Sequence, residues 1–292
     1  IIWSAGNEIP EQWGDSTDNS GTLISKELAA TIRAMDNTRP IVTANNETAS
    51  WNKLLVSGAF DITGYNYHHS EYADVLKKWP GKPFISTEAV SVLQTRGSYD
   101  MPSDSIRRWP VRWDIPLTTG NADTTCSAYD NCSAPWGSTH EETMKVVEKY
   151  NHISGLFVWT GFDYIGEPTP YEWPARSAYF GIVDLAGFPK DVYYMYQSVW
   201  TNKTVLHILP HWNWHTGDTI DVWAYYNNAD EVELYLNGTS LGIRKKSGDD
   251  LHVVWKTIFE PGTLKAVSRK NGQIVKEETI TTAGAPAGIQ LV

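Results

Sequence analysis

The sequence lacks an excess of basic residues and lacks any apolar run long enough to cross a membrane. Lys and Arg number 24 against 34 Asp and Glu, which gives a formal net charge of -10 at pH 7. Because a nucleic-acid partner is normally met by a basic face, this balance argues against nucleic acid. A membrane-spanning helix needs about 20 consecutive apolar residues, and no run approaches that length.

Cysteine is nearly absent. Cys126 and Cys132 lie in a stretch rich in Gly, Pro, Ser and Asp that is typical of a long surface loop. Either a local disulfide or two free thiols would fit these residues. A zinc site needs two more soft ligands nearby, and only His140 is close, so the residues do not favour a metal site.

Aromatic residues, in contrast, are abundant, with 14 Trp and 15 Tyr in 292 residues. Flat aromatic faces pack against the C–H faces of sugar rings, while the polar edges of Tyr and Trp still donate hydrogen bonds. The composition therefore fits carbohydrate binding, although aromatic residues that only fill a core would give the same count.

Residues 1–202 alternate short apolar strands with amphipathic helices. The expected strands are "IIWSAGNE", "RPIVTA", "FDITGYNYHH", "KPFISTEAV" and "GLFVWTGFDY". The expected helices cover residues 20–36, 47–56, 71–79, 139–151 and 192–200. Between the third helix and the fourth, residues 94–138 form an insertion rich in Pro, Gly, Asp and Ser.

Two of these helices carry recognisable end and face signals. In the first helix Ser20 is expected to cap the start, and the apolar face is expected to consist of Leu23, Leu28, Ile32 and Met35. In the fourth helix Ser138 and Glu141 have the spacing of a capping box.

The alternation predicts an α/β fold with a parallel sheet, either open or closed into a barrel. Polar residues follow the carboxyl ends of several strands, which is where a (β/α)₈ barrel assembles its active site. No G-x-G-x-x-G turn of an open nucleotide-binding sheet is present. We therefore expect five of the eight strand–helix units of a TIM barrel. The strand-end polar residues are Asn7, Glu8, Asn66, Tyr67, His68, Glu88 and Asp163.

From residue 203 to residue 283 the pattern becomes all-β. Seven short alternating segments follow one another, and Asn237-Gly238 is a strong hairpin signal. Seven strands in about 80 residues are typical of an immunoglobulin-like sandwich. Residues 284–292 resemble a linker, so the predicted division is 1–202, 203–283 and 284–292.

Glu8 and Glu88 are the main candidates for chemistry. They lie 80 residues apart, or nearly three units of a barrel at roughly 30 residues per unit, and would face each other across its mouth. Glycoside hydrolysis with retention uses such a pair about 5 to 5.5 Å apart, one as acid/base and one as nucleophile. Asn7 is placed to bind a sugar 2-hydroxyl beside the acid/base.

Several segments resemble glycoside hydrolase family 2, in particular its bacterial β-galactosidase-like members. The resemblance implies that Glu8, at the end of the W-S-x-G-N-E stretch, is the acid/base and that Glu88 is the nucleophile. It also implies a tyrosine that hydrogen-bonds the nucleophile, with Tyr67 the first candidate and Tyr65 the second. The segments are "IIWSAGNE", "DITGYNYH", "PFISTEAVS", "GLFVWTGFDYIGEPTPYEWPARSAYFGIVDLAGFPKD" and "YYMYQSVW".

The same resemblance implies that Trp159 forms the floor of the sugar subsite and that Asp163 accepts a hydrogen bond from a sugar hydroxyl, unless it braces a loop. One residue departs from the pattern. Some galactosidases of this family carry a His three residues after the nucleophile, where this sequence has Ser91. His68 or His69 is then the candidate for contact with the galactose hydroxyls.

The resemblance implies a retaining exo-β-glycosidase that acts on terminal β-D-galactosides of an oligosaccharide or glycan, without a cofactor. The alternatives are a relative that acts on a β-glucuronide, β-mannoside or algal galactan, and a carbohydrate-binding fragment that cleaves nothing. In the family other domains and three barrel strands precede the W-S-x-G-N-E strand, so upstream domains are expected. A periplasmic or secreted location is favoured.

Overall fold

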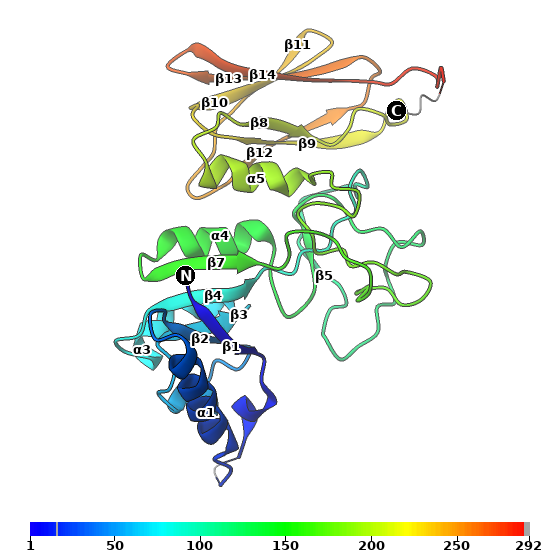
Figure 1. Cartoon of the computed structure of the whole chain (residues 1–292). Coiled ribbons are helices and arrows are strands. Elements are labelled where there is room, and N and C mark those ends of the chain that lie inside the picture. The colour runs from blue at the N-terminus through cyan, green and yellow to red at the C-terminus, as the bar shows by residue number, and fades with distance from the viewer. Residues whose placement is uncertain (16, 289–292) are drawn as a thin grey trace.

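The computed structural model describes residues 1–15 and 17–288 and begins with a curved parallel sheet (Figure 1). All five strands expected from the sequence are present, and they neighbour each other in the order β1-β2-β3-β4-β7 with every pairing parallel. Their bounds are β1 (Trp3–Asn7), β2 (Ile41–Asn45), β3 (Ile62–Asn66), β4 (Phe84–Ala89) and β7 (Ile153–Val158).

Helix α1 (Ser20–Met35) bears out only part of the predicted apolar face, since Ile32 packs against the core but two other members of that face do not. Leu23 is 59% exposed and Met35 is 85% exposed, whereas the buried positions are Gly21, Ser25 and Ala29. Small residues let the helix backbone approach its neighbours, since a Cβ on Gly21 would lie 2.3 Å from the Glu11 carbonyl oxygen. The helix begins after Asn19, so Ser20 is its first residue rather than its cap.

The other expected helices are present in their expected places but not all at their full lengths, and the short helix η1 was not predicted. The fourth helix starts one residue later than predicted, because the capping box is formed by Thr139 and Glu142 rather than by Ser138 and Glu141. None of the helices in the described part of the chain is long and apolar enough to cross a membrane. Their bounds are η1 (Pro10–Trp13), α2 (Lys53–Val56), η2 (His69–Asp74), α3 (Val75–Lys78), α4 (His140–Lys149) and α5 (Asp191–Trp200).

The insertion of residues 94–138 is not the surface loop that its composition predicts. Residues 126–134 are all buried, and Cys126 and Cys132 are both free thiols within one apolar cluster. Short parallel strands β5 (Arg107–Arg108) and β6 (Cys132–Ser133) tie the segment together. Hydrogen bonds satisfy many of its buried polar groups, but Gln94 Oε1 and Asn131 Oδ1 have no hydrogen-bond partner within the described residues. Asp130, in contrast, accepts from the backbone N–H groups of His140 and Glu141 at 2.9 and 2.8 Å.

The seven strands expected after residue 203 are confirmed and form a β-sandwich. One sheet has the order β11-β10-β13-β14 and the other has the order β12-β9-β8. Asn237 and Gly238 both have positive φ, 50° and 84°, as the predicted hairpin turn requires. The strands are β8 (Leu206–Leu209), β9 (Thr219–Tyr226), β10 (Glu231–Leu236), β11 (Thr239–Arg244), β12 (His252–Ile258), β13 (Thr263–Lys270) and β14 (Gln273–Thr281).

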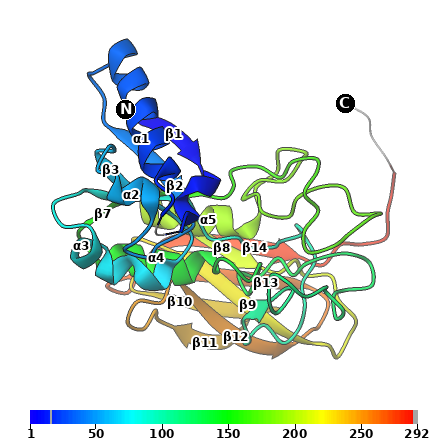
Figure 2. The same cartoon turned by 90° about the horizontal axis from the view of Figure 1, so that it is seen from below.

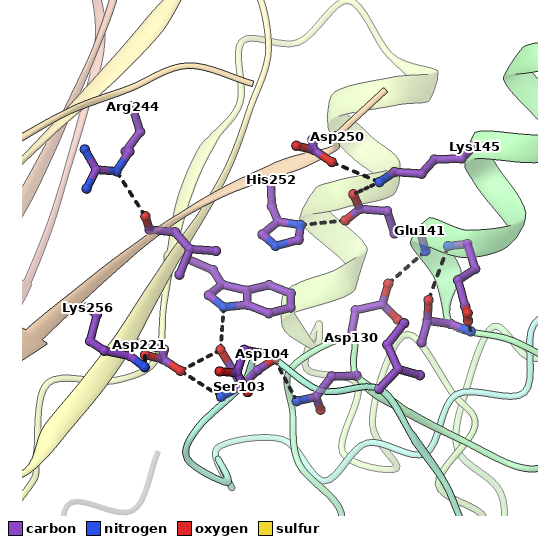
Figure 3. Close-up of a pocket in the computed structure, with 16 residues that line it drawn as sticks. Ser103, Asp104, Asp130, Glu141, Lys145, Asp221, Arg244, Asp250, His252 and Lys256 are labelled. Atoms are coloured by element: carbon purple, nitrogen blue, oxygen red, sulfur yellow. Dashed lines mark hydrogen bonds and ion pairs between the residues drawn. The ribbon is translucent and has the colours of Figure 1, made fainter. Parts of the chain in front are cut away.

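The sandwich packs on the part of the chain that contains α4 and α5, which lie between it and the parallel sheet (Figures 1 and 2). A shared apolar cluster joins Tyr129, Met144 and Tyr196 to Trp223 and Tyr225. A cavity of about 590 Å³ lies at this junction (Figure 3).

Polar contacts cross the same junction beside that cavity. Glu141 on α4 accepts from the backbone N–H of Leu251 at 2.9 Å and pairs with the His252 ring at 2.5 Å (Figure 3). Asp221 on β9 accepts from the backbone N–H and the hydroxyl of Ser103 at 2.7 and 2.9 Å. These bonds fix the sandwich relative to the sheet.

We expect Glu141→Gln to lower the free energy of unfolding by about 2–4 kcal/mol, because it removes the buried carboxylate that bonds to the His252 ring and accepts from the Leu251 N–H. Burial alone would raise the pKa of Glu141, but the hydrogen bond and charge of His252, with the Leu251 N–H, lower it to about 2. The native pair therefore contributes stability above the ordinary carboxyl pKa that is lost as the pH falls towards 2.

Urea unfolding at pH 7 and pH 4 measures this contribution. The stability of the Gln variant should change less between these two pH values than that of the parent protein. Glu148→Gln, on an exposed position of the same helix, is the matched control and should behave as the parent does. Equal losses in the two variants would contradict the assignment.

Candidate active site

A cavity of about 750 Å³ opens at the carboxyl ends of the parallel strands. Six of the candidate residues named from the sequence line this cavity, and they come from the ends of β1, β3 and β7 and from β4 itself. The lining residues are Asn7, Glu8, Trp13, Asn46, Tyr67, His68, Glu88, Trp113, Trp136, Trp159 and Glu167.

The backbone turns sharply where two of these strands end. Glu8, directly after β1, has φ 47°, and Tyr67 and His68, directly after β3, have φ 57° and 53°. The left-handed region is uncommon for residues other than glycine and is costly unless the surroundings hold it. Three such residues around one cavity indicate that the chain is constrained there to aim particular side chains.

Asn66, the last residue of β3, holds Glu8 in place. Its Nδ2 donates to Glu8 Oε1 and to Asn7 Oδ1, both at 2.9 Å, and its Oδ1 accepts from Thr87 Oγ1 at 2.7 Å. The side chain is fully buried. Asn66 was noted in the sequence only as a strand-end polar residue, because nothing local shows that its amide reaches across to β1.

Tyr67 holds Glu88. The Tyr67 hydroxyl donates to Glu88 Oε2 at 2.9 Å, which confirms the predicted contact for the first of the two candidate tyrosines. Tyr65 lies outside the cavity, where its hydroxyl donates to the Thr48 carbonyl at 3.3 Å and accepts from the Trp79 indole at 2.7 Å. Residues 65 and 67 would share a face of a regular strand, but the left-handed turn at Tyr67 sends its ring elsewhere.

The electrostatics of the pair follow from burial and from these partners. Burial raises the pKa of Glu88, the hydrogen bond from Tyr67 opposes that rise, and the charge of Glu8 adds to it. Burial, and then the charge of Glu88, raise the pKa of Tyr67 far above its usual range. Tyr67 is therefore a protonated donor at neutral pH.

The remaining predicted residues divide into two groups. Trp159, directly after β7, lines the cavity with its ring edge-on to Tyr164 at 6.0 Å, and His68 lines it with Nε2 2.9 Å from the Asn46 carbonyl. Asp163 does not reach the cavity. It pairs with the fully buried amino group of Lys190 at 2.8 Å and accepts from the Gly181 N–H at 2.8 Å.

Asp163 therefore braces the loops after β7, which is the alternative that the sequence had left open. Burial raises the pKa of Asp163 and lowers that of Lys190, so each group is stabilised as an ion chiefly by the other. The predicted contact of Asp163 with a sugar hydroxyl has no support in this geometry.

Several lining residues were missed, and they come mainly from the loops. Trp136 and Trp113 belong to the insertion, where only the density of tryptophan could have pointed to them. Gly137 explains how Trp136 reaches the site: a Cβ there would lie 2.0 Å from the Val90 carbonyl oxygen and 2.1 Å from Ser91 Oγ. The absence of a side chain lets this turn press against the residues that follow Glu88.

The cavity offers acceptors and aromatic faces rather than a metal or phosphate site. Among residues 1–15 and 17–288, no three His, Cys, Asp or Glu side chains gather in a way that would hold a metal ion. No Lys or Arg is among the described residues that line the cavity, whereas Glu8, Glu88 and Glu167 are. Two carboxylates among indole rings suit acid/base and nucleophilic chemistry on a neutral polyol such as a sugar.

Comparison with known proteins agrees with this chemistry. Residues 1–112 match the family model "Glycosyl hydrolases family 2, TIM barrel domain", and residues 217–276 match a "Domain of unknown function (DUF4982)". Beta-galactosidase BoGH2A of Bacteroides ovatus is 51% identical over 100% of this chain and 37% of its own length. The chain belongs to glycoside hydrolase family 2.

Other family-2 relatives carry a different substrate in their names. A putative beta-glucuronidase of Formosa agariphila is 32% identical over 99% of this chain and 28% of its own length. Among solved structures, a beta-glycosidase from Bacteroides vulgatus superposes with a TM-score of 0.78 at 30% identity, covering 98% of this chain and 37% of that one. This chain therefore spans between about a quarter and two-fifths of the length of each of these three relatives.

We expect Tyr67→Phe in the full-length protein to move the acidic limb of the pH–rate profile to higher pH. The variant removes a hydrogen bond that stabilises the charged form of Glu88, so the pKa of that carboxyl must rise. A shift of about one pH unit corresponds to the roughly 1.4 kcal/mol of a hydrogen bond to a charged group. The measurement is kcat/KM between pH 4 and pH 9.

Tyr65→Phe is the matched control, since its hydroxyl bonds only outside the cavity. Its acidic limb should stay at the parent position. A profile for Tyr67→Phe that is lowered evenly at every pH, with no displacement of the limb, would contradict the role assigned to the Tyr67 hydroxyl.

Proposed function

We propose that the full-length protein is a retaining exo-β-glycosidase that hydrolyses terminal β-D-galactosides. The observation that carries the proposal is the pair Glu8 and Glu88 in one cavity, each held by a separate residue at the end of β3. Asn66 orients the first carboxylate and Tyr67 orients the second. Such a pair performs glycoside hydrolysis in two steps.

In the first step Glu8, as the acid, gives its proton to the glycosidic oxygen while a carboxylate oxygen of Glu88 attacks the anomeric carbon. The bond to the leaving group breaks and a glycosyl ester with Glu88 forms. In the second step Glu8, now a carboxylate, takes a proton from water, and the oxygen of that water displaces Glu88. The hydrogen bond from Tyr67 keeps Glu88 ionised before attack and favours its departure in the second step.

Asn7, His68 and Trp159 are proposed to bind the terminal sugar. Asn7 lies beside Glu8, and its Oδ1 accepts from Asn66, so its amide NH₂ is left to meet a sugar 2-hydroxyl. His68 contributes a ring for contact with further hydroxyls, and Trp159 an indole face for the C–H side of the ring.

Two lines of support favour a galactoside over a glucuronide. The relative that is 51% identical is named a beta-galactosidase, whereas the relatives named putative beta-glucuronidases are 32% and 37% identical. A uronic acid also brings its own carboxylate, and the described lining contains three carboxylates and no Lys or Arg. A neutral hexose avoids that repulsion.

We further propose that residues 1–202 form the C-terminal part of a TIM-barrel catalytic domain and residues 203–283 an immunoglobulin-like domain. The boundary falls between α5, which ends at Trp200, and β8, which begins at Leu206. Residues 284–292 are proposed as a linker, of which residues 289–292 lie outside the described part of the chain.

A panel of 4-nitrophenyl glycosides tests the sugar. We expect the full-length protein to hydrolyse the β-galactoside with kcat/KM roughly 10²-fold or more above that of the β-glucuronide and the β-mannoside. Faster hydrolysis of the glucuronide would contradict the galactoside assignment. Hydrolysis of none of the three would favour a protein that only binds carbohydrate.

Azide rescue tests the two roles. Glu88→Gly in the full-length protein should lose roughly 10⁴-fold or more in kcat, and azide should restore turnover with an α-configured glycosyl azide, since the anion takes the place of the nucleophile. Glu8→Ala should instead give the β-azide and keep most activity on substrates whose leaving group needs no proton. Product anomers in the reverse order would show that the roles are exchanged.

A further inference from the structure

A second cavity of about 580 Å³ adjoins the catalytic cavity. Trp113 and Trp136 line both cavities, so the two indoles stand at the boundary between them. The other walls of the second cavity come from residues 110–117 of the insertion and from residues 169–172, beyond β7. Anything attached to a sugar in the catalytic cavity on this side would lie against these two rings.

Trp113 is 76% exposed, although the loop that carries it is anchored. Trp109, four residues earlier, is buried, and its backbone N–H donates to the Ser133 carbonyl at 2.9 Å. Arg108 donates to both carboxylate oxygens of Glu142 on α4 at 2.8 Å. A single exposed tryptophan needs no explanation. One that is held at the rim of two adjoining cavities offers a preformed stacking face.

Tyr171 supplies a second fixed aromatic face. Its hydroxyl is already committed, donating to the Thr125 carbonyl and accepting from the Asn121 N–H, both at 2.8 Å. A Cβ on Gly120 would lie 2.6 Å from the Tyr171 ring, so the missing side chain lets this ring pack in closely. Only the ring of Tyr171 is left to meet a ligand.

The charges of the second cavity select the chemistry of that ligand. Asp114 and Glu172 are the charged residues that line it, and no Lys or Arg is among its described lining residues. Arg112 donates to both carboxylate oxygens of Asp114, which leaves Glu172 as the carboxylate that would repel an anion and accept from hydroxyl groups. Aromatic faces together with acceptors are the surface that a neutral sugar ring requires.

We propose that the second cavity is the subsite for the neutral sugar on the leaving-group side of the scissile bond. Its main stacking face is Trp113, and the preferred substrates are accordingly oligosaccharides. This inference rests on the proposed galactosidase function. Contacts in this subsite add binding energy only for a substrate that carries a second sugar.

Two substrates separate the subsite from the catalytic cavity. Lactose carries a glucose on the leaving-group side, whereas β-D-galactosyl fluoride carries only a fluorine atom. In the full-length protein, Trp113→Ala should lower kcat/KM for lactose at least about fivefold more than for the fluoride, as expected for loss of one aromatic contact worth about 1 kcal/mol. Trp113→Phe should recover part of that loss.

Trp173→Ala is the matched control. Trp173 is 75% exposed, as Trp113 is, but its ring lies under the guanidinium of Arg176 at 4.4 Å and it lines neither cavity. This variant should treat both substrates as the parent does. Equal losses on the two substrates for Trp113→Ala, or no loss on either, would overturn the proposal.

A binding measurement keeps the inference separate from the proposed activity. In the full-length Glu88→Gln protein, lactose is titrated by isothermal calorimetry with and without Trp113→Ala. A weaker affinity for lactose, with an unchanged affinity for methyl β-D-galactoside, supports the subsite. Equal affinities with and without Trp113→Ala overturn it. If the parent protein hydrolyses neither galactosyl donor, the galactosidase proposal fails, while this comparison still decides the subsite.

Discussion

The candidate active site depends on one constraint, which is that parallel strands place their carboxyl ends at the same edge of a sheet. Glu8 follows β1 and Glu88 lies near the end of β4, with β2 and β3 between them. The end of β3 contacts both carboxylates, because Asn66 bonds to Glu8 and the next residue, Tyr67, bonds to Glu88. A shift at this one strand end would therefore displace both groups at once.

The insertion adds Trp113 and Trp136 to the cavity at this edge. Its base is buried around Cys126 and Cys132. Asp130 ties this base to α4, because its carboxylate accepts hydrogen bonds from the first two backbone N–H groups of that helix. Burial raises the pKa of Asp130 to about 7 although these two N–H groups oppose the rise. The sandwich packs on the same helix through Glu141, so the insertion, α4 and the sandwich support one another. The loop that carries Trp113 joins this base at Trp109, whose backbone N–H donates to the Ser133 carbonyl, and within the loop the Ile115 N–H donates to the Arg112 carbonyl at 3.2 Å.

Much of the fold was predictable because its signals are local. The five sheet strands and seven sandwich strands are short apolar or alternating runs bounded by turn residues, and all twelve are present. The sequence prediction failed in two places, where burial depends on close packing and hydrogen bonding rather than on a periodic pattern of apolar residues. Helix α1 buries Gly21, Ser25 and Ala29 completely and its larger residues Ile24 and Ile32 only in part, because close approach to its neighbours matters more than hydrophobicity at those positions. Residues 126–134 are mostly polar or small and still buried, and the hydrogen bonds that Asp130 accepts from α4 help to hold them there.

The sequence was enough to identify the two catalytic candidates, two candidate tyrosines for the contact with Glu88, and the order of an α/β part before an all-β part. Each of these features lies in a contiguous stretch, so the resemblance of that stretch to a known family is enough to find it. The folded chain was needed to choose Tyr67 over Tyr65 and to show that Asn66 reaches Glu8, that Asp163 pairs with Lys190, and that Trp113 and Trp136 stand between two cavities. Each of these contacts joins residues at least 21 positions apart or depends on how loops pack. Residue periodicity reports only which face of its own strand or helix a side chain occupies, so it carries no information about such contacts.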